Sequence, residues 1–510
     1  MAQMILAHDI GTTGDKATLF RDDGTLVASS FSAYPTYYPH PGWAEQEPAD
    51  YWEAFCASTR TLLAASGARP SDVAVIAFSG QMMAALAIDA EGNPLRRSII
   101  WADTRSTAEE EAIGERVSPE KVYAITGHRL SASYSATKIM WIRGHEPDVY
   151  RRAAKFIHAK DFLVLRLTGR VCSDYSDASS MNLLDITAMR WSPEILEASG
   201  ITESLLPDLF ESPTVVGKVT AAAAKQCGLT DGTPVVIGGG DGACATCGAG
   251  VVKEGDAYIC LGTSTWLATA STRPLIDPKK RTFTFCHFYK GLYFPCGTMQ
   301  AGGGSLKWLK DTLGDAESAA MKGAGDVYDL INAKAAAVPA GSEGLLFLPY
   351  LMGERSPWWN TRARASFIGL TMRHTKGHMI RAVMEGVAYN MRIIADVFTE
   401  LGMKFDLFRM IGGGAKSAVW RQVFADVLEG PVARMSFLDE ATSIGAAIAG
   451  GVGVGIFSGI DEAARIVRQV ERTEPDPAAF PVYRRGFRAF TRGYEQLVPV
   501  FDMLSEEQKS

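Results

Sequence analysis

Two short polar turns in the sequence combine the residue types that hold phosphate groups. The first, DIGTTG at residues 9–14, places Thr12 and Thr13 between two glycines after an apolar run. Glycines let backbone N–H groups point into one concavity and threonine hydroxyls add donors, so this turn can cradle anionic oxygens. Asp9 ends the apolar run, where its carboxylate can hold Mg²⁺, and Lys16 can add a positive charge. Taken alone, the segment is equally consistent with an ordinary hairpin.

The second turn, LGTST at residues 261–265, repeats this inventory in the other half of the chain, with Gly262 and Thr263 at its centre. Two such hairpins facing one cleft would hold the β- and γ-phosphates of a nucleotide from both sides, because phosphoryl transfer depends mainly on positioning and charge stabilisation. The P-loop signature G-x-x-x-x-G-K-[ST] does not occur in the chain. The two turns therefore predict a nucleotide site without a P-loop.

A third segment, VVIGGGDGA at residues 235–243, carries one carboxylate, Asp241, in a glycine-rich turn between an apolar strand and a helix of small residues. A carboxylate there can act as a general base that takes a proton from a hydroxyl. The ordinary alternative is an aspartate that caps the helix. The segment also fits G-x-G-x-x-A, a weak dinucleotide signature, but Asp241 would repel a pyrophosphate.

Two further glycine runs can line a nucleotide pocket. IGGGAKS at residues 411–417 repeats the order of strand, glycines and helix. Gly413 and Gly414 would let a flat base lie against the backbone, and Ser417 could bond the base edge or its sugar; the alternative is a close helix–strand contact without a ligand. Gly303 and Gly304 would form the facing wall.

Residues 101–105, WADTR, offer contacts for a small polyol. Asp103 and Arg105 can bond neighbouring hydroxyls, and Trp101 presents an apolar face to a carbon skeleton. An internal Asp–Arg ion pair is equally consistent with this segment.

The apolar patterning supplies elements that would position these segments. Turn-separated strands over residues 5–9, 17–20 and 26–30 form a meander, and strands over 257–261 and 266–270 begin a second one. The second half thus restarts the fold of the first near residues 252–256, with two unrelated hairpins as the alternative. We further expect strands over 73–78, 86–89 and 407–411, and helices over 50–65, 106–116, 377–401 and from residue 480.

The composition is that of a large globular protein. A chain of 510 residues, 47% apolar and 21% charged, favours two domains. A formal charge of −6 without clustered Lys and Arg argues against a nucleic-acid partner. The sequence predicts neither a signal peptide nor a membrane span, so we expect a cytoplasmic protein. Among eight scattered cysteines, Cys244 and Cys247 are better explained as buried helix thiols than as a zinc or redox site.

The ordered series of motifs resembles the FGGY family of carbohydrate kinases, most closely its xylulokinase-like members. The resemblance covers nearly the whole chain. It implies an α/β fold of two ribonuclease-H-like (actin-like ATPase) domains, residues 1–254 and 255–510, which close over sugar and ATP. It rests on residues 9–13, 134–141, the Asp241 turn, 261–264, 353–357 and 412–417, and most specifically on ASFIGL at 365–370 and HMIRAVMEG at 378–386.

The resemblance also implies cofactors and residue roles. The cofactors are ATP and Mg²⁺, the catalytic base is Asp241, and the metal-site residues are Asp9 and Asp241. Residues 378–385 fit a structural helix better than a site. With the residue chemistry above, the phosphate contacts are Thr12, Thr13, Lys16, Gly262 and Thr263, and the nucleotide contacts are Gly303, Gly304, Gly413, Gly414 and Ser417.

The predicted sugar pocket departs from the family pattern. Gln81, Met82 and Met83 stand where related kinases contact the sugar, but xylulokinases usually have Met-His there and glycerol kinases Arg-Glu. A thioether cannot replace an imidazole donor, which puts D-xylulose in doubt. Gly242 stands where xylulokinases tend to have Asn after the base, so the pocket next to Asp241 is wider and less polar. One methionine can instead be core filler.

The expected activity is ATP-dependent phosphorylation of a hydroxyl on a small ketose or polyol. Two alternatives stay open. A sugar-acid (gluconate-type) kinase of the same family would use Arg105 or Lys138 to meet the carboxylate, and an actin-like ATPase would have no sugar substrate. The expected partners are the sugar and ATP, with a homodimer as one option for the assembly.

Overall fold

The first half of the protein is built on a six-stranded mixed sheet. The computed structural model describes residues 3–314 and 326–507. Within it, the strand order of this sheet is β13-β14-β5-β1-β2-β3, where β1 to β3 form an antiparallel meander and β5 and β14 run parallel to β1. The bounds are β1 Met4–Ile10, β2 Gly14–Arg21, β3 Leu26–Ala33, β5 Val73–Gly80, β13 Val215–Lys218 and β14 Pro234–Gly240.

The second half repeats this arrangement in a seven-stranded sheet. Its order is β17-β18-β16-β15-β21-β22-β23, in which β15, β16 and β18 are antiparallel while β21 and β22 run parallel to the β15 direction. The central strands β18-β16-β15-β21-β22 thus match β3-β2-β1-β5-β14, and the predicted restart of the fold is confirmed. The bounds are β15 Ala257–Leu261, β16 Thr265–Thr269, β17 Phe283–Cys286, β18 Tyr293–Met299, β21 Phe408–Ile411, β22 Val432–Met435 and β23 Gln469–Thr473.

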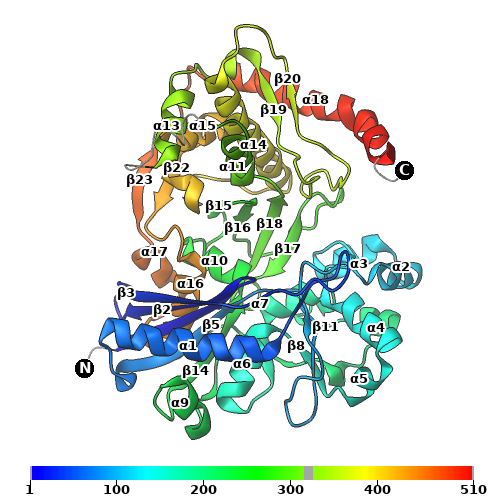
Figure 1. Cartoon of the computed structure of the whole chain (residues 1–510), viewed down its shortest axis with the longest axis vertical. Helices are drawn as coiled ribbons and strands as arrows, with labels where there is room; N and C mark the ends of the chain where they lie inside the picture. The colour runs from blue at the N-terminus through cyan, green and yellow to red at the C-terminus, as the bar shows by residue number, and fades with distance from the viewer. Residues whose placement is uncertain (1–2, 315–325, 508–510) are drawn as a thin grey trace.

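Two equivalent helices join the halves. Helix α10 (Asp241–Gly248) follows β14, α16 (Ala441–Gly453) follows β22, and both lie between the two sheets in Figure 1. A Cβ on Gly248 would lie 1.8 Å from the Ala441 carbonyl oxygen, and one on Gly445 would lie 1.9 Å from that of Cys244. The two helix backbones therefore touch. Helix α16 also packs on β1, β5 and β14, so part of the second half completes the core of the first.

The predicted elements are confirmed, with small shifts at their ends. Helix α1 (Pro48–Ser66) corresponds to the predicted helix 50–65, α14 (Lys376–Glu400) to 377–401, and α18 (Phe480–Glu507) begins at the predicted residue. Between β5 and β14 the chain forms an inserted, mostly helical lobe, shown in cyan in Figure 1. Of this lobe the sequence predicted only β6 (Leu86–Ile88) and α2 (Thr107–Arg116).

The remaining helices and strands complete the inserted lobe and the outer layers. Their bounds are α3 Pro119–Thr126, α4 Ser135–His145, α5 Pro147–Arg152, α6 Ala159–Thr168, α7 Tyr175–Ala178, α8 Pro193–Ser199, α9 Ala221–Cys227, α11 Gly303–Leu313, α13 Val327–Ala336, α15 Ala418–Leu428, α17 Ala463–Ile466, β4 Glu45–Gln46, β7 Ser98–Ile99, β8 Lys155–Ile157, β9 Cys172–Asp174, β10 Leu184–Asp185, β11 Arg190–Trp191, β12 Asp208–Phe210, β19 Leu346–Leu348 and β20 Ser366–Ile368.

The cysteines and the helix lengths agree with the sequence analysis. All eight cysteines are free, and Cys244 and Cys247 are buried in α10, as predicted. In the described ranges, no helix has both the length and the apolar character needed to cross a bilayer.

Candidate active site

Asp241 is the first residue of α10, directly after the glycines that end β14. Gly238 has φ +68°, and a Cβ there would lie 1.8 Å from the Phe78 carbonyl oxygen, so only glycine lets β14 come this close to β5. The β14–β5 register shifts at this point. The N-cap of α10 is Gly240, so Asp241 is not the capping residue that the sequence allowed as an alternative.

Asp241 lies where the two halves meet. A Cβ on its neighbour Gly242 would lie 3.0 Å from the ring of Phe294, which belongs to β18 of the second half. Burial, and then repulsion from Asp9 and Asp177, raises the pKa of Asp241 to about 7. Among the described residues, no side chain donates a hydrogen bond to this carboxylate. A carboxylate without a side-chain donor, whose pKa is near neutrality, is suited to general-base chemistry.

The first predicted phosphate turn, residues 11–13, joins β1 to β2 and exposes Thr13 at its tip. Beneath it, Asp9 accepts hydrogen bonds from the hydroxyls of Ser79 (2.8 Å) and Thr442 (2.6 Å). Burial raises the pKa of Asp9, whereas these two hydrogen bonds lower it. Because Thr442 belongs to α16, the carboxylate beneath the first turn is bonded directly to the second half.

Lys16 makes a second connection between the halves. Its Nζ donates to the Asp439 carbonyl oxygen over 2.8 Å and lies 3.6 Å from the Glu440 carboxylate. Its positive charge also lowers the pKa of Asp9. Lys16 therefore sits beside the first turn, with its ammonium directed to the loop that begins α16.

The second predicted turn is held by the run of Gly303 and Gly304, which the sequence predicted as the wall facing Gly413 and Gly414. The Gly303 N–H donates to the Gly262 carbonyl oxygen (2.8 Å), and the Gly304 N–H donates to that of Thr263 (2.9 Å). Like Thr13, Thr263 is exposed at the tip of its turn. The two turns thus present equivalent threonines from equivalent hairpins.

Gly413, Gly414 and Ser417 lie between β21 and α15. A Cβ on Gly414 would lie 2.3 Å from a side chain of β15, the strand that leads into the second turn, whereas nothing lies within 4 Å of a Cβ on Gly413. The Ser417 hydroxyl caps α15 and donates to Asn332 over 2.7 Å. Gly414 therefore makes the close contact weighed as the alternative, while Gly413 borders open space.

Gln81, Met82 and Met83 follow β5 and lie next to the Asp241 turn. A Cβ on Gly240 would lie 2.7 Å from the Met82 sulfur, so Met82 packs directly on the end of β14. Met82 is buried in the core between the halves, in agreement with core filler. Gln81 is also buried and donates to Gln46 over 2.7 Å, but its Oε1 has no hydrogen-bond partner in the part of the chain that the structure describes.

Trp101 connects the predicted sugar residues with the first turn, because its Nε1 donates to the Thr12 hydroxyl over 2.8 Å. Asp103 and Arg105 bind each other instead of facing a free space. Arg105 Nη2 lies 2.7 Å from Asp103 and 2.8 Å from Glu45, and the side chains of the first two are 1% exposed or less. The structure thus shows the internal ion pair that the sequence left as an equal alternative.

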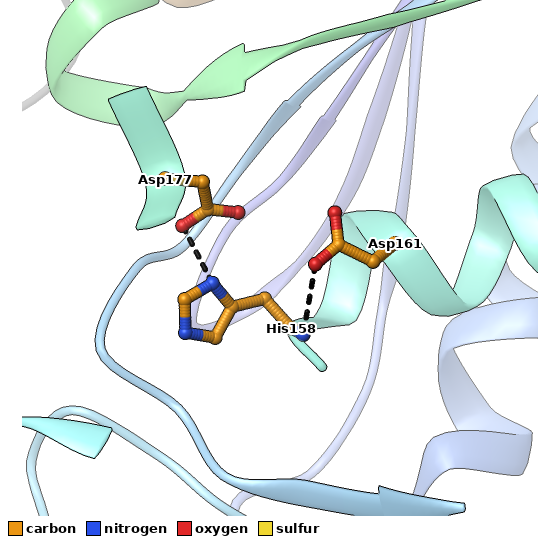
Figure 2. Close-up of side chains that lie close together, drawn as sticks. All are labelled: His158, Asp161 and Asp177. Carbon is orange, nitrogen blue, oxygen red and sulfur yellow. Dashed lines mark hydrogen bonds and ion pairs between the residues drawn. The ribbon is translucent and has the colours of Figure 1, made fainter. Parts of the chain in front are cut away.

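A buried cluster that the sequence analysis missed lies behind the Asp241 turn. Figure 2 shows three of its members: His158 Nδ1 lies 2.7 Å from Asp177, and the His158 backbone N–H donates to Asp161 over 3.1 Å. The Lys160 ammonium lies 2.7 Å from Asp161, 3.0 Å from Asp174 and 3.3 Å from Asp177. Burial opposes its charge, yet these carboxylates raise the pKa of Lys160 well above its ordinary value. The ammonium therefore supplies the positive charge that a metal ion would otherwise bring.

This cluster reaches the catalytic candidate through one short chain of contacts. Asp174 accepts a hydrogen bond from the Ser176 hydroxyl, which in turn accepts one from the Gly240 N–H over 3.0 Å. Gly240 directly precedes Asp241. The available signal in the sequence was the charged pair Lys160–Asp161 inside the apolar run 156–167, where a solvated pair is not expected.

Comparison with protein families identifies both halves. The model of the FGGY family of carbohydrate kinases, N-terminal domain, matches residues 4–248, and that of the C-terminal domain matches residues 257–454. The chain belongs to the FGGY family of carbohydrate kinases. The resemblance noted from the motifs is thereby confirmed.

Individual relatives of this FGGY kinase match it over nearly its whole length. The xylulose kinase of Escherichia coli is 32% identical, with 98% of this chain and 100% of the relative covered. The gluconokinase of Bacillus subtilis is also 32% identical, with 99% and 96% covered. Among solved structures, the xylulose kinase from Rhodospirillum rubrum has a TM-score of 0.89 at 33% identity and covers 98% of this chain and 100% of its own. The gluconate kinase from Lactobacillus acidophilus has a TM-score of 0.91 at 26% identity, with 99% and 100% covered.

Membership of the FGGY family decides the enzyme class. The chain is an ATP-dependent sugar phosphotransferase with two actin-like ATPase domains, as the motif series predicted. The roles of individual site residues and the division at residues 254 and 255 stay predictions.

Proposed function

We propose that this FGGY kinase transfers the γ-phosphoryl group of ATP to a hydroxyl of a small neutral ketose or polyol, with Asp241 as the general base. The observation that carries the proposal is the Asp241 carboxylate at the junction of the halves, whose pKa is raised to about 7. A base is most effective when its pKa is near the working pH. Asp241 would take the proton of the sugar hydroxyl as its oxygen attacks the γ-phosphorus.

The two turns would hold the phosphates. Thr13 and Thr263 are exposed at their tips, and each hairpin also offers backbone N–H groups. Gly413, which borders open space, and Gly414 would line the nucleotide's base together with the Gly303 run. Burying the reacting groups between the halves would exclude water, which competes with the sugar hydroxyl as acceptor.

The carboxylates also fit a magnesium ion. Asp9 and Asp241 are close enough for the charge of Asp9 to raise the pKa of Asp241, and a cation would relieve this repulsion. Carboxylate and hydroxyl oxygens are the ligands that Mg²⁺ prefers. When bound, Mg²⁺ would neutralise charge on the transferring phosphates.

The substrate class follows from the cations near the pocket. The sequence left Arg105 and Lys138 as groups that could meet the carboxylate of a sugar acid. In the structure, Arg105 is buried against Asp103 and Glu45, and the Lys138 ammonium donates to three backbone carbonyls. Both cations are already bonded to groups of the protein, so neither is available for a substrate carboxylate. This favours an uncharged sugar over gluconate-type acids as the substrate.

A substrate panel tests this proposal. ADP release should be sugar-dependent and abolished by EDTA, and kcat/KM for the preferred neutral ketose or polyol should exceed that for any sugar acid by about tenfold or more. The panel comprises pentuloses, hexuloses, polyols and aldonic acids, each with a reaction lacking sugar as the blank. Preference for an aldonic acid would show that the substrate assignment is wrong.

The compartment and partners belong to the same proposal. Eight free cysteines suit a reducing compartment such as the cytoplasm. The partners are the sugar and ATP. A homodimer stays a prediction from the sequence.

A further inference from the structure

Lys138 is a fully buried lysine on α4 whose ammonium donates to three backbone carbonyls. Its Nζ donates to the carbonyl oxygens of Met83 (2.8 Å), Ile100 (2.8 Å) and Ser133 (2.6 Å). An ammonium has three N–H donors, so all of them are used. Burial lowers the pKa of Lys138 to about 7, although the Asp103 carboxylate raises it. Burying a charged ammonium costs free energy, and the hydrogen bonds to the three carbonyl dipoles offset part of this cost.

The three carbonyls come from three separate segments, and those of Met83 and Ile100 belong to or adjoin residues of the predicted sugar pocket. Met83 follows Met82, whose sulfur lies against the end of β14 and the Asp241 turn. Ile100 precedes Trp101, which donates to the first phosphate turn at Thr12. Ser133 directly precedes Tyr134, the N-cap residue of α4. These segments are far apart in the sequence, yet a single side chain bonds all three.

The Met83 segment has a backbone conformation that is unfavourable for its residue type. Its φ is +65°, in the left-handed region that residues with a Cβ rarely adopt. Its N–H donates to the buried Ser180 hydroxyl over 3.0 Å, and its carbonyl accepts from Lys138. Such a conformation persists only where the surroundings impose it. Ser180 and Lys138 therefore fix the Met83 backbone from both sides.

We propose that Lys138 is a positioning residue that holds the segments around Met83, Ile100 and Ser133 in the shape that presents a sugar hydroxyl to Asp241. This inference rests on the proposed sugar kinase function. In the absence of the ammonium, the Met83 segment would be free to leave its left-handed conformation, and Met82 would move relative to the Asp241 turn. Sugar binding would weaken, while the two phosphate turns would keep their own contacts.

The test is Lys138→Met, which keeps the length of the side chain and removes its donors. We expect the KM for the preferred sugar to rise by about tenfold or more, with the KM for ATP changed by less than about twofold, because only the sugar segments lose a tether. A purely structural lysine would affect both constants alike or neither. The matched control is Lys155→Met, since Lys155 Nζ donates to a single carbonyl, that of Leu206 (2.7 Å). This control should leave both KM values unchanged.

Ser180→Ala provides a milder second variant, so the inference stays testable should Lys138→Met fail to fold. It removes the acceptor of the Met83 N–H together with the hydroxyl's own hydrogen bond to the Asp177 carbonyl oxygen (2.7 Å), and we expect the sugar KM to rise by about two- to fivefold with the ATP KM unchanged. An unchanged sugar KM in both variants, or in Ser180→Ala alone if the other does not fold, would overturn the inference. A wild-type enzyme without sugar-dependent ADP release would instead overturn the proposed function.

Discussion

Asp241→Asn should lower kcat for sugar phosphorylation by about 10²- to 10⁴-fold, the range that loss of a general base produces. Asparagine keeps the size and polarity of the side chain but cannot take the proton of the sugar hydroxyl. The loss should appear in kcat more than in the KM for ATP, because the amide leaves both phosphate turns intact. Steady-state ADP release at saturating sugar and ATP measures it.

Asp231→Asn is the matched control for this variant. Asp231 is exposed and lies just before β14, the strand that leads to the Asp241 turn. The control should keep wild-type kcat. If Asp241→Asn also retained turnover within about threefold of wild type, Asp241 could not be the base, since base catalysis contributes at least about 10²-fold.

Lys160→Met should destabilise the first half by about 3–5 kcal/mol, because it leaves buried carboxylates without their cation. Lys160 lies within 2.7–3.3 Å of Asp161, Asp174 and Asp177, and all four side chains are buried. The effect should be seen as a lower midpoint in urea unfolding followed by tryptophan fluorescence. Activity at low temperature should fall as well, since Asp174 reaches the Gly240 backbone through Ser176.

Two further variants separate the buried network from lysine loss in general. Lys253→Met removes an exposed lysine whose Nζ lies 3.9 Å from Asp461, and it should change stability by less than about 0.5 kcal/mol. Lys160→Met combined with Asp177→Asn restores part of the charge balance and should be more stable than Lys160→Met alone. A single Lys160→Met variant with a wild-type midpoint would contradict the assignment of Lys160 as the compensating charge.

The parts of the fold that could be predicted are those encoded locally. The turn at residues 11–13 and its counterpart at 262–264 join apolar strands through glycine and threonine, a pattern that is visible within about a dozen residues. The packing of α16 on the first sheet could not be foreseen, because it joins residues more than 350 positions away from β5. The glycines at the α10–α16 contact, Gly248 and Gly445, become meaningful only once both helices are placed.

The candidate site divides in the same way. Asp241 was found because its glycine turn, its strand and its helix are contiguous in the sequence. Asp103 and Arg105 could not be assigned, because their pairing also involves Glu45, a residue of β4. The contacts of Lys138 were the hardest to predict from the sequence. Its three acceptors are backbone carbonyls, which every residue carries, so the residue types around Lys138 do not reveal them.

The most direct test of sugar kinase activity is the fate of the γ-phosphoryl group, followed by phosphorus NMR in a mixture of enzyme, Mg²⁺, ATP and the preferred sugar from the panel. We expect one sugar phosphate ester for each ADP formed, with little inorganic phosphate when sugar is omitted. Inorganic phosphate formed at the same rate with and without sugar, and no ester signal, would contradict this, because the chain would then be an ATPase and not a sugar kinase.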